Sequence, residues 1–175
     1  MTFHDPPEPG VPQRSLLSAL PTGANGDGRA RVYLHAGRAY LAIDPTAIVC
    51  MLGSCVAVCL WDRKLKIGGA VHYLLPGEPD VPSLNSGMQG INELILQMRD
   101  AGANPSNLLG KIFGGACILR ELRGNRIGTR NITAARVCLS KNHIAIVAES
   151  VGGEQGRKVV FHSDTGETLT RLIGK

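Results

Sequence analysis

The chain has 175 residues, of which 43% are hydrophobic and 19% charged, a composition typical of one packed domain and not of a disordered chain. Its longest apolar runs fall well short of the roughly 18 residues that suggest a membrane span, and no basic-then-apolar leader opens the sequence. The net charge of +5 suits phosphate or an acidic protein partner, but with three Phe, three Tyr and one Trp for base stacking we expect no nucleic-acid binding, no membrane insertion and a cytoplasmic location.

The first 28 residues differ from the rest of the chain. They contain five of the ten prolines, followed by a glycine-rich stretch that ends at Gly28. Such a composition cannot bury enough apolar surface to offset the entropy of ordering the chain. We therefore predict a flexible N-terminal tail over residues 1–28 and a single folded domain over residues 29–175.

The first half of this domain reads as strands. Short strands are expected at residues 31–34 and 38–43, and an apolar stretch over 46–52 ends in Gly53 and Ser54. Two apolar runs, 55–61 and 67–75, flank the polar cluster Asp62–Lys66 and predict a β-hairpin, although a helix at 55–61 also fits so short a run.

The second half predicts helices and further strands. Apolar residues at 91, 94, 95 and 98 lie on one helical face, with Asn85 or Ser86 at the start and Gly102 at the end. A second helix is expected to begin at Asn131 as its cap, and strands are expected at 109–113, 144–149, 158–162 and 168–173. The fold class predicted is an α/β (α+β-like) sandwich with a mixed, largely antiparallel sheet and packed helices.

The five cysteines indicate reduced thiols, because their number is odd and no leader precedes them. The spacing of Cys50, Cys55 and Cys59 lacks the paired pattern of a structural zinc site, and no histidine falls within the group. We expect no metal and interpret most of these thiols as core residues.

Cys55 stands out because it follows Gly53 and Ser54, a pair that permits a sharp turn with free amide N–H groups. A hairpin turning within Asp62–Lys66 would place Cys55 opposite His72, or nearly so, with Cβ atoms about 5 Å apart. Such a pair could be a nucleophile with its base, or two packing partners. In the first case we expect the thiol pKa to fall below the ~8.5 of a free cysteine.

Several separated strings in one order closely resemble the CheD family of chemoreceptor glutamine deamidases. They are LGSCVAVCLWD from residue 52, IGGAVHYLLP from 67, KIFGGA from 111, NRIGTRN from 125, ESVGG from 149 and DTG from 164. The resemblance covers residues 31–174 and leaves out the proline-rich tail. It implies a fold similar to that of papain-like toxin deamidases.

The resemblance implies that Cys55 is the nucleophile and His72 its base, with Gly53 and Ser54 forming the turn that stabilises an oxyanion. Some relatives carry a catalytic threonine six positions before the cysteine, where this chain has Val49. Thr46, Ser54 or a backbone carbonyl is then the candidate that orients the imidazole.

The implied reaction is hydrolytic deamidation of glutamine side chains in methyl-accepting chemotaxis receptors, acting on their cytoplasmic domains and needing no cofactor. Family members also bind a CheC-type response-regulator phosphatase. A non-catalytic regulatory module for that partner is therefore the alternative function. A thiol redox protein is a weaker alternative, because Cys59, four residues farther on, would lie about 13 Å along the strand from Cys55.

Overall fold

The computed structural model describes residues 28–77, 86–118 and 127–174. The predicted tail therefore lies outside the described residues, apart from Gly28. The described residues form nine strands, two α-helices and one short 3-10 helix: β1 (Ala30–Tyr33), β2 (Arg38–Ala42), β3 (Thr46–Leu52), β4 (Val56–Asp62), β5 (Ile67–Tyr73), α1 (Gly87–Asp100), η1 (Pro105–Asn107), β6 (Leu108–Gly114), α2 (Ile127–Lys141), β7 (Ala145–Val151), β8 (Gly156–His162) and β9 (Thr168–Ile173).

The strands form two sheets. One has four strands in the order β1-β3-β8-β9, and the other has five in the order β2-β5-β4-β6-β7. The β1–β3 and β6–β7 pairs are parallel and all other pairs are antiparallel, so the predicted mixed, largely antiparallel class is confirmed. The sequence did not predict that the strands would divide between two sheets.

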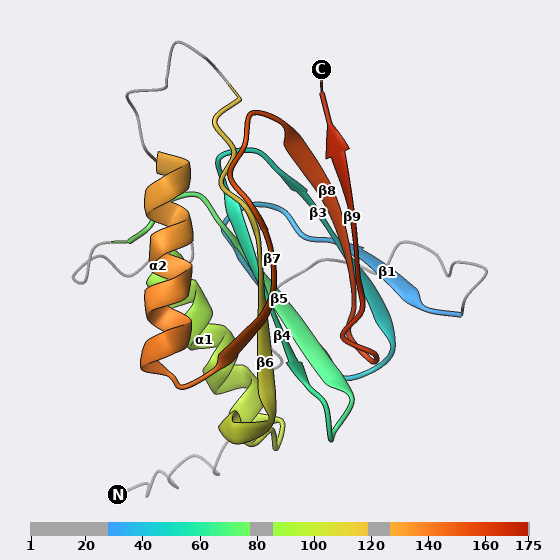
Figure 1. The fold of residues 1–175 in the computed structure, drawn as a ribbon. Coiled ribbons are helices and arrows are strands. Elements are labelled where there is room, and N and C mark those ends of the chain that lie inside the picture. The colour runs from blue at the N-terminus through green and yellow to red at the C-terminus, as the bar shows by residue number, and fades with distance from the viewer. Residues whose placement is uncertain (1–27, 78–85, 119–126, 175) are drawn as a thin grey trace, which may run out of the picture.

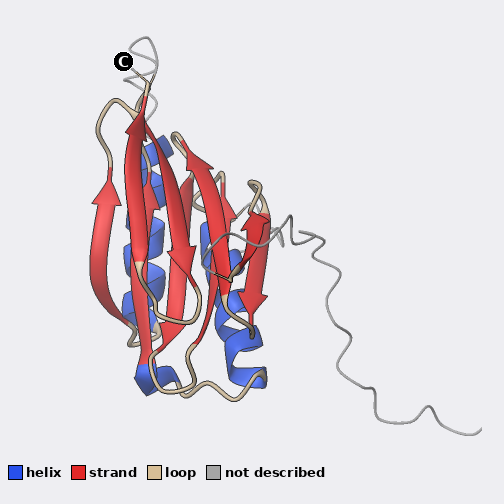
Figure 2. Ribbon diagram, turned by 90° about the vertical axis from the view of Figure 1, so that its right-hand side faces the viewer, coloured by secondary structure: helices blue, strands red, loops and turns tan. Residues whose placement is uncertain are grey.

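The molecule has three layers (Figure 1). Both helices cover one face of the five-stranded sheet, and the four-stranded sheet covers its other face. Figure 2 shows the two helices behind the strands. In the described part of the chain, neither helix is long and apolar enough to cross a membrane.

The central strand β4 is buried on both faces, which explains why its sequence is a continuous apolar run. Val56, Val58 and Leu60 pack toward the helices. Ala57 and Cys59 alternate with them and pack toward the four-stranded sheet. The helix alternative for residues 55–61 is therefore wrong.

The two helices differ in how well their ends were predicted. Ser86 is the N-cap residue of α1, and Gly102 follows its end with a φ of 94°. By contrast, α2 already begins at Ile127, so Asn131 lies within the helix and is not its cap. The Asn131 side chain points into the protein, where it has other hydrogen-bond partners.

Leu94 tests the layer between α1 and the five-stranded sheet. Its side chain is fully buried, whereas Leu96 on the same helix is 51% exposed. Leu94→Ala should lower the free energy of unfolding by about 2–5 kcal/mol, because it leaves a cavity. Leu96→Ala should change it by no more than about 0.5 kcal/mol. Urea unfolding of both variants measures the difference, and equal losses would contradict this packing.

Candidate active site

The β4–β5 hairpin brings the expected pair to the same end of the five-stranded sheet. His72 pairs with Ala57, and Val56 pairs with Tyr73. Cys55, immediately before β4, therefore lies diagonal to His72 and not directly opposite it, which corrects the predicted register by two residues. Diagonal neighbours on one face have Cβ atoms within about 7–8 Å of each other.

The turn at the other end of the hairpin sets this register. The carboxylate of Asp62 accepts hydrogen bonds from the backbone N–H groups of Lys64 (2.8 Å) and Leu65 (3.0 Å). Lys66 has a φ of 59° and donates its N–H to the Asp62 carbonyl at 2.9 Å. The loop therefore spans the four residues between the paired Asp62 and Ile67. Its centre lies one residue farther along the chain than the centre that a direct Cys55–His72 pair would require.

His72 is held by a backbone carbonyl. Its Nδ1 lies 3.0 Å from the carbonyl oxygen of Leu34, the residue that follows β1. A carbonyl only accepts, so Nδ1 carries the proton and Nε2 keeps its lone pair. Nε2 is buried and has no hydrogen-bond partner among the described residues.

The electrostatics of the pair favour neutral groups. Burial lowers the pKa of His72; the bond to Leu34 works against this shift and nearby His35 adds to it. Burial raises the pKa of the Cys55 thiol, and the residue's own backbone N–H partly offsets that rise. The expectation that this thiol has a lowered pKa is therefore wrong: no thiolate–imidazole ion pair offsets the burial of Cys55.

Three of the other four cysteines are core residues, as expected for most of these thiols. Cys50 and Cys59 are buried between the sheets, and burial raises the pKa of Cys50 to about 12 and that of Cys59 well above its ordinary value. Cys138 is buried on the inner face of α2, with its thiol 3.4 Å from an Asn92 side-chain oxygen. Cys55 and Cys117 are the half-buried ones.

The turn before the nucleophile candidate is fixed through three successive carbonyls. The carbonyl of Gly53 accepts from the N–H of Ala116 at 2.8 Å, and that of Cys55 accepts from the N–H of Gly115 at 2.8 Å. Between them, the Ser54 carbonyl accepts from the side-chain amide of Asn131 at 3.1 Å. Each of these three peptides is therefore fixed by a hydrogen bond to its carbonyl oxygen.

Gly114 lets β6 come this close. It has a φ of 107°, and a Cβ there would lie 2.2 Å from the carbonyl oxygen of Cys55. The backbone N–H of the following residue makes one of the three bonds described above. The glycines of the KIFGGA string therefore allow the close approach of β6 to the turn.

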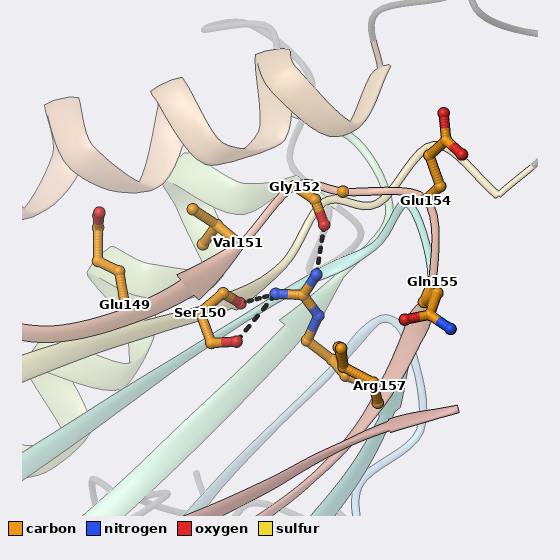
Figure 3. Close-up of a pocket in the computed structure, with 9 residues that line it drawn as sticks. Glu149, Ser150, Val151, Gly152, Glu154, Gln155 and Arg157 are labelled. Atoms are coloured by element: carbon orange, nitrogen blue, oxygen red, sulfur yellow. Dashed lines mark hydrogen bonds between the residues drawn. The ribbon is translucent and has the colours of Figure 1, made fainter. Parts of the chain in front are cut away.

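The loop between β7 and β8 is hydrogen-bonded to the end of β6 and to the residues that follow it. The N–H of Gly152 donates to the Gly114 carbonyl, and the N–H of Cys117 donates to the Gly153 carbonyl, both at 2.8 Å. Figure 3 shows the buried Arg157 guanidinium pointing at the carbonyls of Ser150 and Gly152, which it bonds, beside a pocket of about 470 Å³. The loop after β7 is thereby tied to β8.

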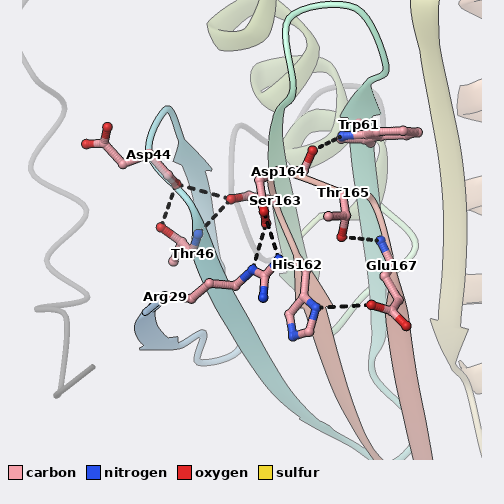
Figure 4. A network of polar contacts seen from close by, with 9 residues as sticks. All are labelled: Arg29, Asp44, Thr46, Trp61, His162, Ser163, Asp164, Thr165 and Glu167. Atoms are coloured by element: carbon pink, nitrogen blue, oxygen red, sulfur yellow. Dashed lines mark hydrogen bonds and ion pairs between the residues drawn. The ribbon is translucent and has the colours of Figure 1, made fainter. Parts of the chain in front are cut away.

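Thr46, the candidate for orienting the imidazole, lies in another part of the protein. Figure 4 shows it in the polar network at the start of β3, whereas Gly53 and Cys55 follow the end of that strand. Its hydroxyl donates to the Asp44 carbonyl at 2.9 Å. Of the alternatives the sequence left open, the backbone carbonyl is the one that contacts His72.

Sequence reasoning missed two contributors to this site. The Leu34 carbonyl is a backbone group, so no residue type could have indicated it. Asn131 did carry a signal, because it falls on the buried helical stripe of Ala135 and Cys138, where an amide needs a specific partner.

Comparison with known proteins shows the family of the chain. The family model described as CheD chemotactic sensory transduction matches residues 75–172. A protein of Anaeromyxobacter dehalogenans, named a probable chemoreceptor glutamine deamidase, is 41% identical over 165 residues, which cover 93% of this chain and 96% of the relative. A Sulfurimonas denitrificans protein with the same description is 37% identical over 147 residues, covering 82% and 94%.

Among solved structures, a Neisseria meningitidis protein matches 85% of this chain and 77% of its own, with 16% identity and a TM-score of 0.44, which is too low to support an argument. The sequence relatives are decisive, because they match over nearly their whole length at well above 30% identity. The chain belongs to the CheD family.

Proposed function

We propose that this protein hydrolyses the side-chain amide of glutamine residues in the cytoplasmic domains of chemoreceptors, with Cys55 as nucleophile and His72 as base. The observation that carries the proposal is the buried Nε2 of His72, which has no partner in the described part of the chain. It lies at the end of the β4–β5 hairpin where the chain enters β4 from Cys55. The names of the relatives supply the substrate class.

The first half of the reaction forms a thioester. His72 Nε2 takes the proton from Cys55 Sγ, and the sulfur attacks the side-chain carbonyl carbon of glutamine. The carbonyl oxygen becomes an oxyanion, which backbone N–H groups at Ser54 and Cys55 stabilise. The imidazolium then returns its proton to the amide nitrogen, and ammonia leaves as the C–N bond breaks.

The second half hydrolyses the thioester. His72 removes a proton from water, the hydroxide attacks the thioester carbon, and the same backbone N–H groups hold the new oxyanion. Cleavage of the C–S bond releases glutamate, and the sulfur recovers its proton from His72. The Leu34 carbonyl stabilises the imidazolium in both halves, because it accepts the Nδ1 proton.

The backbone geometry of the turn supports the oxyanion role. In a planar trans peptide the C=O and N–H groups point in opposite directions. The carbonyls of Gly53 and Ser54 are both bonded to groups inside the protein. The N–H groups of Ser54 and Cys55 in those same two peptides therefore point away from the protein interior, toward an incoming carbonyl oxygen.

Cys55→Ala should abolish ammonia release from a receptor fragment, because the covalent step loses its nucleophile. Mass spectrometry of the fragment should then find glutamine unchanged. Cys117→Ser is the matched control, since that thiol is also half-buried and takes no part in the reaction. Full activity in Cys55→Ala would exclude Cys55 as the nucleophile. No ammonia release by the wild-type protein would instead favour the regulatory module that binds a CheC-type phosphatase.

His72→Ala should lower kcat by about 10²–10⁴-fold, the usual contribution of a general acid–base group. His143→Ala, which changes an exposed histidine beyond α2, should leave kcat unchanged. A loss of less than tenfold at His72 would assign proton transfer to another group.

The pH dependence should follow the two shifted groups. Because the pKa of His72 is lowered, its neutral form persists as pH falls, and kcat/KM should decline only below the ordinary imidazole value of about 6.5. Because the pKa of Cys55 is raised, its alkylation by iodoacetamide should reach half its maximum rate above about pH 8.5. Peptide mapping measures that rate, and a half-maximum below pH 7 would indicate a preformed thiolate.

A further inference from the structure

We propose that Asn131 is a positioning residue that fixes the direction of the Cys55 backbone N–H, and so completes the oxyanion site. This inference rests on the proposed function and concerns a residue that makes no bond to the substrate and transfers no proton in the reaction. Asn131 is fully buried within α2.

The asparagine joins the two strands that carry the reacting groups. Its Nδ2 donates to the Ser54 carbonyl at 3.1 Å and to the Leu74 carbonyl at 2.8 Å. Ser54 directly precedes Cys55, and Leu74 lies two residues after His72. One amide group thereby holds the nucleophile turn against the end of β5.

Only the first of these bonds acts on the oxyanion site. The Ser54 carbonyl and the Cys55 N–H belong to one planar peptide, so holding the oxygen inward holds the N–H outward. Ala116 and Gly115 hold the neighbouring peptides through backbone N–H groups, which remain when a side chain is truncated. The peptide between Ser54 and Cys55 is instead held by a side chain, and it is the one whose N–H also lowers the thiol pKa.

Asn131 is itself anchored. The hydroxyl of Tyr73 donates to its backbone carbonyl at 2.7 Å, and Tyr73 is fully buried in β5 beside His72. The side-chain Oδ1 of Asn131 is buried and has no hydrogen-bond partner among the described residues. A buried acceptor without a partner costs stability. The amide is therefore placed for its donors, and a packing role alone would be filled better by an apolar residue.

The test uses Asn131→Ala, with Leu139→Ala as the control for lost stability, because Leu139 is also fully buried on α2 and has no bond to the turn. Asn131→Ala should lower kcat on a receptor fragment about 10²-fold, as the loss of one oxyanion donor does, with KM changed less than about threefold. Leu139→Ala should keep wild-type kcat at a temperature where it is folded.

The alkylation profile of Cys55 gives a readout that does not need the receptor. In Asn131→Ala the half-maximum of iodoacetamide labelling should move to higher pH, because the Cys55 backbone N–H is no longer held where it stabilises the thiolate. In Leu139→Ala the half-maximum should stay at the wild-type pH. Tyr73→Phe should change kcat and the profile in the same direction but less, and it serves as the measured variant if Asn131→Ala does not fold.

Wild-type kcat and an unmoved labelling profile in Asn131→Ala, or in Tyr73→Phe where it replaces that variant, would overturn the positioning role. A lower melting temperature with those two results would assign Asn131 to stability only. Activity in Cys55→Ala would instead overturn the proposed function, so the two failures are distinguishable.

Discussion

The site depends on how the central strand β4 begins. β4 is hydrogen-bonded on one side to β5 and on the other to β6, so the position of its first residue is fixed from both sides. The chain reaches that strand through a turn whose three successive carbonyls all have donors inside the protein. A nucleophile placed directly after such a turn is oriented without any bond to its own side chain. Its backbone N–H is oriented by the same constraint.

This arrangement leaves polar atoms unsatisfied where catalysis needs them. The imidazole Nε2 of His72 is buried without a partner among residues 28–77, 86–118 and 127–174, and burial lowers the pKa of this histidine. A buried nitrogen of this kind costs stability unless it finds a partner, and the substrate complex or the Cys55 thiol can provide one. Catalytic hydrogen bonds often tighten only in the complex, which fits a thiol that stays protonated until substrate is bound.

The sequence predicted much of the fold because its signals were local. The apolar runs on both sides of Asp62–Lys66 predicted the hairpin, and the spacing of Ile91, Leu94 and Met98 predicted α1. The register was off by two residues, since it depends on the four-residue turn that the Asp62 carboxylate organises. The division into two sheets depends on contacts between distant segments, which a local pattern does not report.

The sequence predicted the two candidate reacting residues of the site, but not the groups that hold them in place. Cys55 and His72 were identified from the hairpin and the family resemblance, and the untested roles assigned to them stay predictions. Asn131 was taken for a helix cap, because Asn is common there and its inward partners lie in two other elements. The sequence could not indicate which backbone carbonyl contacts His72, since every residue has such a group.

The central claim is that Cys55 carries the glutamine carbonyl as a thioester, and trapping that intermediate tests it most directly. A receptor fragment mixed with the enzyme, quenched in acid within milliseconds to seconds and digested, is analysed by mass spectrometry. We expect the peptide that contains Cys55 to carry the receptor fragment as an adduct less one ammonia, and we expect no such adduct in Cys55→Ala. Release of ammonia with no adduct at any quench time, or an adduct on Cys117, would contradict it.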